Sequence, residues 1–182
     1  KETLADDADG AAVTVWYTVT RSGTTAPVRS DETGYTVSIN NYTELNEDFE
    51  NNGDVTLADG DELTLSTSGA ILYGPASIKR PRVQHSPQII NSCLLVGSTC
   101  KIKFPTLFLN FRVGLIAEEE FNDDSGVTII FYDLANNETE RFHVDLSSTA
   151  TWVERVMTNG PACSIVIASQ TSILVDNITI KF

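Results

Sequence analysis

Two polar residues interrupt the apolar run that closes the sequence, ILVDNITIKF at 173–182. A carboxylate buried in a strand costs free energy unless it is hydrogen-bonded or neutralised by a cation. Two roles therefore fit Asp176 and Asn177. They form a β-bulge or cap a loop backbone, or Asp176 contributes to a cation site that joins the end of the chain to its beginning.

The residues that could perform acid–base or nucleophilic chemistry do not form a catalytic motif. The two histidines, His85 in KRPRVQH and His143 in RFHVDL, lie outside any GxSxG or HExxH pattern. The acidic run AEEEFNDD at 117–124 is typical of a solvated turn, with a calcium site as the alternative, rather than of a glycosidase carboxylate pair. We expect no enzymatic activity.

Three cysteines are present, and two of them could lie close together. Cys93 and Cys100 flank LLVGST, a loop short enough for a hairpin that would bring both sulfurs into disulfide range. The alternative is that these two residues and Cys163 are separate thiols. The seven-residue spacing is not a common zinc pattern.

Composition limits the partners. The net charge of -13 disfavours nucleic acid, because phosphate binding requires an excess of Lys and Arg. Apolar runs stay well short of the ~18 residues of a membrane span, so we expect no membrane insertion. The first residues, KETLADDADG, do not resemble a secretory signal, and a start without Met predicts a processed chain or a piece of a longer one.

Strand signals recur along the chain and helix signals are nearly absent. In TLFLNFRVGLI (106–116), the alternation places Leu107, Leu109, Phe111, Val113 and Leu115 on one face and Phe108, Asn110 and Arg112 on the other. Such two-sided strands are typical of antiparallel sheets packed face to face. The sequence thus predicts an all-β fold, an antiparallel β-sandwich or jelly roll. The predicted strands are 62–67, 70–74, 93–97, 101–104, 106–116, 126–134, 138–146, 151–158, 163–169 and 172–182.

The N-terminal part has a different texture. Strands at 12–20 and 35–39 could pair as a hairpin with a long loop, and NNYTELNEDFENNGD reads as a linker into a new domain. Two strands are too few for independent stability. We predict an N-terminal β-hairpin segment over 1–44 and a sandwich or jelly-roll domain over 45–182.

Three short motifs resemble parts of known modules. NEDFENNG (46–53) resembles the opening, and ILVDNITI (173–180) the closing strand, of jelly-roll carbohydrate-binding modules with a galactose-binding-like fold. Between them, VTIIFYDLANNETERFHVDL is similar to a strand, turn and return strand of bacterial secreted jelly rolls. The N-terminal segment is similar to the last hairpin of bacterial Ig-like repeats.

The resemblance implies a structural calcium ion where the first and last strands meet. The matching positions are Glu50, from DFE, and Asp176, from VDN, whose carboxylates are the hard oxygen ligands that calcium prefers. Glu47 stands where these modules usually have Gly.

The resemblance also implies sugar binding, in which an aromatic ring stacks on the pyranose and polar side chains read its hydroxyls. The candidate ligand-binding residues are Tyr73, Tyr132 and Trp152 as rings, with Asn110, Arg112 and Gln84 as polar readers. We expect a non-catalytic module of a secreted or cell-surface bacterial protein that binds carbohydrate. The alternative is a structural, self-assembling module whose partner is another protein subunit.

Overall fold

The computed structural model describes residues 43–82, 87–118, 126–146 and 149–182, and four short strands between residues 12 and 36. The chain divides into two compact units, 1–42 and 43–182. No helix occurs in the described residues, so none of them forms a helix that could cross a membrane.

The N-terminal unit contains two antiparallel strand pairs. β1 (Ala12–Val15) pairs with β4 (Thr33–Thr36), and β2 (Thr18–Val19) pairs with β3 (Val28–Arg29). The predicted pairing of 12–20 with the segment near 35 is confirmed, although β4 begins two residues earlier than expected.

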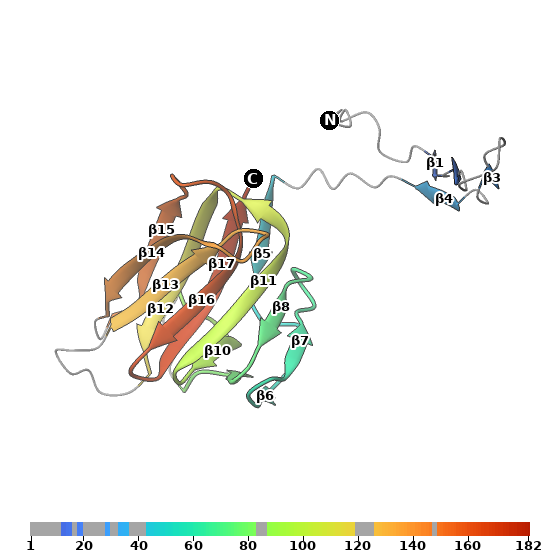
Figure 1. Ribbon diagram of the computed structural model, residues 1–182. Coiled ribbons are helices and arrows are strands. Elements are labelled where there is room, and N and C mark those ends of the chain that lie inside the picture. The colour runs from blue at the N-terminus through green and yellow to red at the C-terminus, as the bar shows by residue number, and fades with distance from the viewer. Residues whose placement is uncertain are drawn as a thin grey trace. The chain divides into compact units, whose positions relative to one another are not determined.

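The larger unit is a sandwich of two antiparallel sheets, as the sequence predicted (Figure 1). The first sheet has the order β15 (Thr151–Val156), β12 (Asn110–Ala117), β17 (Ile173–Lys181), β10 (Cys93–Val96), β9 (Ala76–Lys79) and β6 (Val55–Leu57), and β5 (Glu44–Glu47) also pairs with β17. The second sheet has the order β14 (Glu138–Asp145), β13 (Gly126–Tyr132), β16 (Ala162–Ser169), β11 (Thr99–Phe108), β8 (Ile71–Tyr73) and β7 (Glu62–Thr64).

The core lies between the sheets and includes a chain of phenylalanine rings. Phe111 of the first sheet meets Phe131 of the second at 5.2 Å between ring centroids, and Phe104, Phe108 and Phe142 extend the contacts. Edge-to-face ring pairs at such distances add to the stabilisation from burial. This apolar layer fixes which residues of each strand point outward.

The chain crosses from the second sheet to the first at Leu109, which corrects the prediction of one continuous strand over 106–116. β11 ends at Phe108 and β12 begins at Asn110. Because the inward side changes at the crossing, Phe108 is buried beside Phe111, while Leu107 and Leu109 are 37% and 42% exposed.

A second crossing between the sheets, from β10 to β11, corrects the disulfide prediction. Cys93 and Cys100 do not share a hairpin, because β10 belongs to the first sheet and β11 to the second. Cys93 packs in a small cluster with Ile89, Ile116 and Leu174, whereas Cys100 lies in the main core. Both are buried free thiols, as is Cys163.

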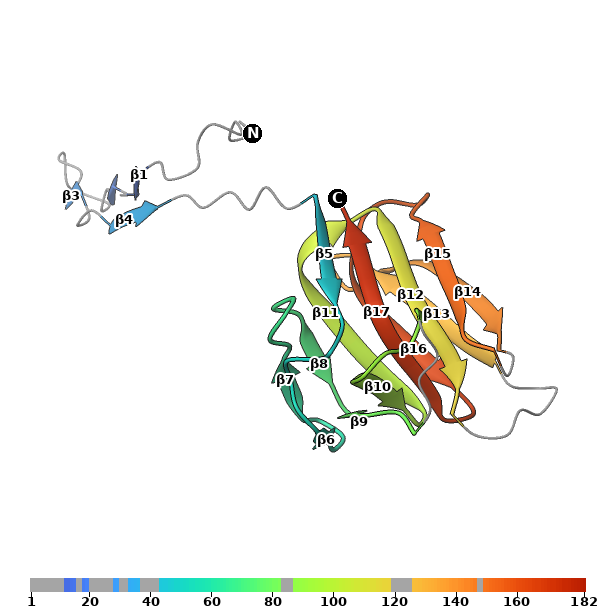
Figure 2. The same cartoon turned by 180° about the vertical axis from the view of Figure 1, so that it is seen from behind.

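The predicted meeting of the opening and closing segments is confirmed. β17 has β12 along one side, and along the other side β10 pairs with residues 173–175 and β5 with residues 178–181. Figure 2, with the first sheet in front, shows β5 beside β17. β5 lies in the stretch that the sequence predicted to be a linker. β17 is therefore an interior strand that joins both ends of the larger unit.

Candidate functional site

Eight outward side chains from four neighbouring strands form the floor of a groove of about 450 Å³ on the first sheet. The strand register places them in two rows across β15, β12, β17 and β5, which lie side by side in Figure 2. One row is Val156, Asn110, Lys181 and Glu44; the other is Glu154, Arg112, Thr179 and Asn46. A volume of this size is typical of small-molecule sites.

Arg112 stands at the centre of the β15–β12 side. Its guanidinium carbon lies 3.7 Å from the centroid of the Trp152 ring, and its Nε lies 3.1 Å from a carboxylate oxygen of Glu154. The buried Nε–H has no hydrogen-bond acceptor among the described residues, so the contact with Glu154 is an ion pair without an aligned hydrogen bond. The stack orients the guanidinium plane while leaving Arg112 donors unused.

The β5–β17 side is held by three polar contacts. Thr179 donates to the side-chain oxygen of Asn46 at 2.7 Å, and the Asn46 amide donates to Glu44 at 3.3 Å. Lys181 lies 3.5 Å from the Glu44 carboxylate. Asn110, opposite Lys181, makes no side-chain hydrogen bond with another described residue, so its amide is available to a ligand.

The Asp176–Asn177 pair holds in place a loop that lies over Gly114, two residues along β12 from Arg112. The β17 backbone bulges here against β12, and Asn177 adopts a φ of 50°. Asp176 accepts hydrogen bonds from the backbone N–H groups of Ile90 at 2.8 Å and Asn177 at 2.7 Å. The Asn177 amide donates to the carbonyl of Gln88 at 3.0 Å. The bulge and loop-capping role expected as one alternative is confirmed.

Gly114 permits this loop to lie directly on the sheet. A Cβ at this position would lie 2.4 Å from the Gln88 carbonyl oxygen, which is too close for any side chain. The loop in turn covers the outer cluster of Cys93, Ile116 and Leu174. The loop and the groove therefore lie over different parts of the outer face of the first sheet.

Two glutamates at the end of β5 also organise loops. Glu50 accepts a hydrogen bond from the Ser92 backbone at 3.1 Å. Glu47, 1% exposed, accepts from the Ser68 hydroxyl at 2.6 Å and from the backbone N–H of Phe49 at 2.8 Å. Sequence reasoning noted Glu47 only as a departure from Gly and missed this role. The Ser68 partner is 21 residues away, so only the folded structure pairs them.

Burial raises the pKa of Asp176 to about 7. The hydrogen bonds from Ile90 and Asn177 oppose this shift, and the nearby carboxylates of Glu50 and Asp48 add to it. Glu50 and Asp176, predicted to lie together, are thus within electrostatic reach of each other. Among the described residues, however, no three His, Cys, Asp or Glu side chains form a cluster that could hold a metal ion.

The six predicted ligand-binding residues do not form one site in the described part of the chain. Asn110, Arg112 and Trp152 lie together on the first sheet, whereas Tyr73 and Tyr132 lie on the outer face of the second, and Gln84 lies outside the described residues, as does His85. Alternation alone could not assign strands to sheets, which is why the two groups were predicted as one set.

The Trp152 ring is also less accessible to a ligand than the sequence predicted. Arg112 covers its ring on the groove side, and Trp152 lines a separate hollow of about 360 Å³ with His143 and Asp145, between the edge strands β14 and β15. Its direct contact with Arg112 holds the guanidinium of that groove residue in place.

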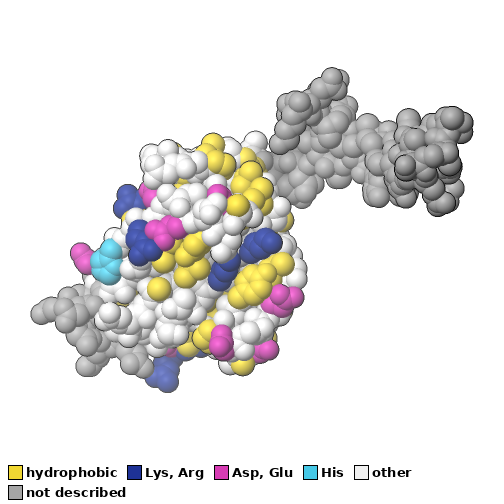
Figure 3. All heavy atoms as spheres, viewed as in Figure 1, with side chains coloured by type: hydrophobic (Ala, Val, Ile, Leu, Met, Phe, Trp, Pro, Cys, Tyr) yellow, Lys and Arg dark blue, Asp and Glu magenta, His cyan; other side chains and the backbone are white. Residues whose placement is uncertain are grey.

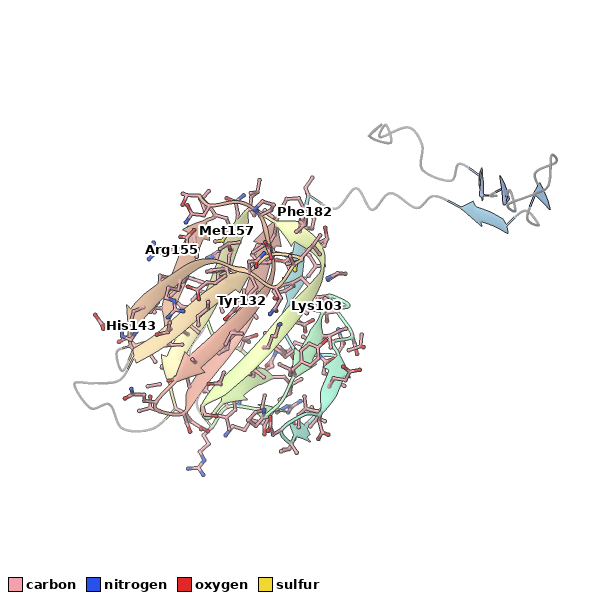
Figure 4. All side chains as sticks on the ribbon, viewed as in Figure 1. Lys103, Tyr132, His143, Arg155, Met157 and Phe182 are labelled. Atoms are coloured by element: carbon pink, nitrogen blue, oxygen red, sulfur yellow. The ribbon has the colours of Figure 1, made fainter. Side chains whose placement is uncertain are left out.

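On the outer face of the second sheet, Tyr73 and Tyr132 lie near Lys101. Lys101 lies opposite Tyr73 in the register, and its ammonium is 5.6 Å from the Tyr132 ring centroid and donates to Asn136 at 2.8 Å. Figure 3 shows this face with hydrophobic side chains in separate patches among Lys and Arg, and Figure 4 shows Tyr132 and Lys103 on it.

No protein-family model matches the sequence, and no curated protein matches it. Solved structures are similar in fold. An arabinose-bound GH51 α-L-arabinofuranosidase gives a TM-score of 0.51 at 9% identity, over 77% of this chain and 26% of that enzyme.

Two smaller proteins are similar over most of their length. A DUF4465 family protein from Bacteroides caccae gives a TM-score of 0.48 at 14% identity, over 76% of this chain and 99% of that one. A variant of the family 29 carbohydrate-binding module CBM29-2 gives 0.41 at 13% identity, over 76% and 90%. At these identities the chain shares its fold with about a quarter of the arabinofuranosidase, and its similarity to the other two is distant.

Proposed function

We propose that residues 43–182 form a non-catalytic glycan-binding module of a bacterial secreted or cell-surface protein, with the groove of β15, β12, β17 and β5 as its binding site. The observation that carries the proposal is the two-row floor of amide, hydroxyl and charged side chains on one rigid sheet. The extracellular location rests on the sequence motifs at 46–53 and 173–180.

The floor suits a sugar because its polar groups can form hydrogen bonds to sugar hydroxyls, in place of or beside their present contacts. The Asn110 amide offers a donor and an acceptor, and Arg112 offers several donors in one plane. Asn46 and Thr179 already bond to each other at 2.7 Å and can share their remaining donors and acceptors with a ligand. Side chains fixed on paired strands lose little entropy when a ligand binds.

The positions of the acidic residues support binding without hydrolysis. Glu44 and Glu154, the two carboxylates of the groove, lie on β5 and β15, three strand spacings apart. At about 4.8 Å per spacing these strands are about 14 Å apart, beyond the roughly 5–9.5 Å that separates the carboxyl groups of glycosidases. Each is also ion-paired with a basic neighbour.

Calcium at Glu50 and Asp176 stays part of the proposal as a stabilising ion outside the groove. It is supported by the burial of Asp176 without an ion pair to Lys or Arg among the described residues, and by the repulsion from Glu50 and Asp48. A cation would relieve both costs. Since no three side chains gather there, the other ligands would be backbone carbonyls or water.

A glycan array followed by calorimetric titration of the best ligand tests the function. We expect Asn110→Ala to weaken binding about five- to tenfold, through the loss of about 1–1.5 kcal/mol of hydrogen bonding. Thr64→Ala, an exposed threonine of β7 in the second sheet, is the matched control and should leave affinity unchanged. Absence of binding to every glycan, or equal affinity of Asn110→Ala and wild type, would contradict the proposed site.

Tyr73→Ala and Tyr132→Ala separate the two faces of the sandwich. If they abolish binding while Asn110→Ala does not, the glycan lies on the second sheet around Lys101. If only the groove variant weakens binding, the tyrosines serve no ligand. A chelator added to each titration reports whether binding needs calcium.

A second candidate function is protein assembly, which exposed apolar residues at one end of the sandwich favour. Leu109, Val156 and Phe182 are 42%, 63% and 39% exposed. Leu109 is held between β15 and β17 by backbone hydrogen bonds to Met157 and Lys181, and Figure 4 shows Met157 and Phe182 at this end. Clustered apolar exposure is typical of contact surfaces. Concentration-dependent light scattering that Val156→Ser abolishes would support this role.

A further inference from the structure

The groove is less acidic than the rest of the chain. Its floor holds two basic side chains, Arg112 and Lys181, and two acidic ones, Glu44 and Glu154. The whole chain has 12 Lys and Arg against 25 Asp and Glu. The two signs are thus balanced on this floor, which favours a ligand with negative charge here over the acidic remainder of the chain.

The central cation is oriented but incompletely paired. Arg112 is stacked at 3.7 Å on Trp152, and its buried Nε–H has no acceptor among the described residues. Its counterion, Glu154, has a side chain that is 68% exposed. Exposed ion pairs contribute little free energy, so a ligand carboxylate can replace Glu154 at small cost. A planar carboxylate matches the planar fork of an arginine better than it matches a lysine.

Neighbouring groups add a second cation and neutral hydrogen-bonding groups around Arg112. Lys181 lies in the adjacent row, opposite Asn110, and Thr179 lies opposite Arg112. Arg155 directs its guanidinium away from this floor, to the Phe142 ring of the second sheet, 4.3 Å away. One carboxylate beside several hydroxyls would engage the cations and the amides together.

We infer that the glycan is acidic and that a uronic-acid residue lies in the groove with its carboxylate at the Arg112 guanidinium. This inference rests on the proposed function and specifies its ligand class. It concerns binding alone and requires no covalent step.

The test is a calorimetric titration with a uronic-acid oligosaccharide and with the same oligosaccharide after reduction of its carboxyl groups to alcohols, at 0.15 M salt without divalent cations. We expect the acidic form to bind at least about tenfold more tightly. Arg112→Met should remove this preference, and Arg112→Lys should restore only part of it, because lysine keeps the charge and lacks the fork.

Glu154→Gln should change the affinity for the acidic oligosaccharide in the opposite direction. Removing the competing carboxylate frees Arg112, so affinity for the acidic oligosaccharide should rise a few-fold while affinity for the reduced form stays constant. Arg141→Met, an exposed arginine of β14 paired with Glu138 on the other sheet, is the control and should change neither. Thermal melting of each variant verifies folding.

The outcomes separate the two claims. Equal binding of both oligosaccharides overturns the acidic-ligand inference and leaves the glycan-binding function standing. Equal binding of a sulfated oligosaccharide and the uronate also overturns the carboxylate assignment, since it indicates general anion attraction. No binding of these or of any glycan on the array overturns the function as well.

Discussion

Asp176 shows how one buried carboxylate can organise a loop through hydrogen bonds alone. Both of its oxygens accept backbone N–H groups, one from Ile90 and one from Asn177. Because its side chain is 1% exposed, water cannot replace these bonds when the carboxylate is removed. The cost of a substitution should therefore include two unsatisfied donors.

We predict that Asp176→Ala lowers the free energy of unfolding by about 2–4 kcal/mol, from the lost hydrogen bonds and the unsatisfied N–H groups. Chemical denaturation of both proteins at pH 6 measures the difference. Asp145→Ala, at a side chain that is 98% exposed, is the control and should change stability by less than about 0.5 kcal/mol. A loss at Asp176 no larger than the control would contradict the loop-anchoring role.

The raised pKa of Asp176 predicts a pH dependence. Its folded value of about 7 lies above the ordinary 3.8, so the folded state favours the protonated form. The stabilisation is complete below about pH 4 and is lost as pH rises through 7, by up to about 4 kcal/mol at ~1.4 kcal/mol per pKa unit. Denaturation at several pH values in chelator measures it, and subtracting the curve of Asp176→Asn isolates this residue.

Calcium should reverse that trend. A bound cation stabilises the carboxylate, so millimolar calcium should remove the loss of stability near neutral pH in wild type and leave Asp176→Asn unaffected. Identical melting temperatures of wild type in calcium and in chelator at pH 7.5 would defeat the calcium proposal.

At the scale of elements, the crossing between β11 and β12 determines which residues around it are buried and which are exposed. It separates Phe108 from the outer face of Asn110 and Arg112, and it exposes Leu107 and Leu109. An earlier crossing, from β10 in the first sheet to β11 in the second, separates Cys93 from Cys100. Where the chain passes from one sheet to the other, the side of the backbone that faces the core changes. A strict alternation with a period of two therefore assigns the wrong face to the residues on one side of the crossing.

The cysteine arrangement predicts a simple thiol count. Burial raises the pKa values of the Cys93 and Cys100 thiols to about 12, with the Asp176 charge as a second cause for Cys93. We expect a thiol reagent to label none of the three cysteines in the folded protein at pH 8 and all three after denaturation without reductant. One label after denaturation would indicate a disulfide.

Much of the fold could be predicted because local patterns determined it. Alternation identified most strands of both sheets, and the DLANNET turn at 133–139 formed as expected, with Asn136 at a φ of 61°. β5, β6 and β9 were missed because each has four residues or fewer and mixes polar with apolar side chains. Their pairing partners, rather than their own composition, make them strands.

The candidate site was predictable only in part for a related reason. Asn110 and Arg112 follow from one strand's alternation, and both line the groove. Asn46, Glu154, Thr179 and Lys181 enter it through the register of β5, β15 and β17, which pairs residues as distant in the sequence as Asn46 and Thr179, 133 positions apart. No spacing within the sequence encodes that register.

At the scale of the whole molecule, the net charge of -13 opposes the acidic ligand that the groove favours. Salt decides which effect dominates. At 0.15 M the Debye length is about 8 Å, so a bound carboxylate experiences mainly Arg112 and its neighbours. At 0.01 M it is about 30 Å, and the acidic surface of the whole chain contributes.

We therefore predict that affinity for a uronic-acid oligosaccharide weakens when salt is lowered from 0.15 M to 0.01 M, the reverse of ordinary screening of an ion pair. Titration at both salt concentrations measures it, with the carboxyl-reduced oligosaccharide as the uncharged control. Stronger binding at low salt would show that the groove's own field extends further than the charge of the rest of the chain.

The position of β17 has a consequence for biosynthesis. The edges of β5, β10 and β12 that pair with β17 stay unpaired during translation, because β17, at residues 173–181, is the last strand of this unit to be translated. Until the ribosome releases this segment, those edges can recruit strands of another nascent chain. A stop codon before Ile173 should thus give insoluble material rather than a slightly shorter, folded product.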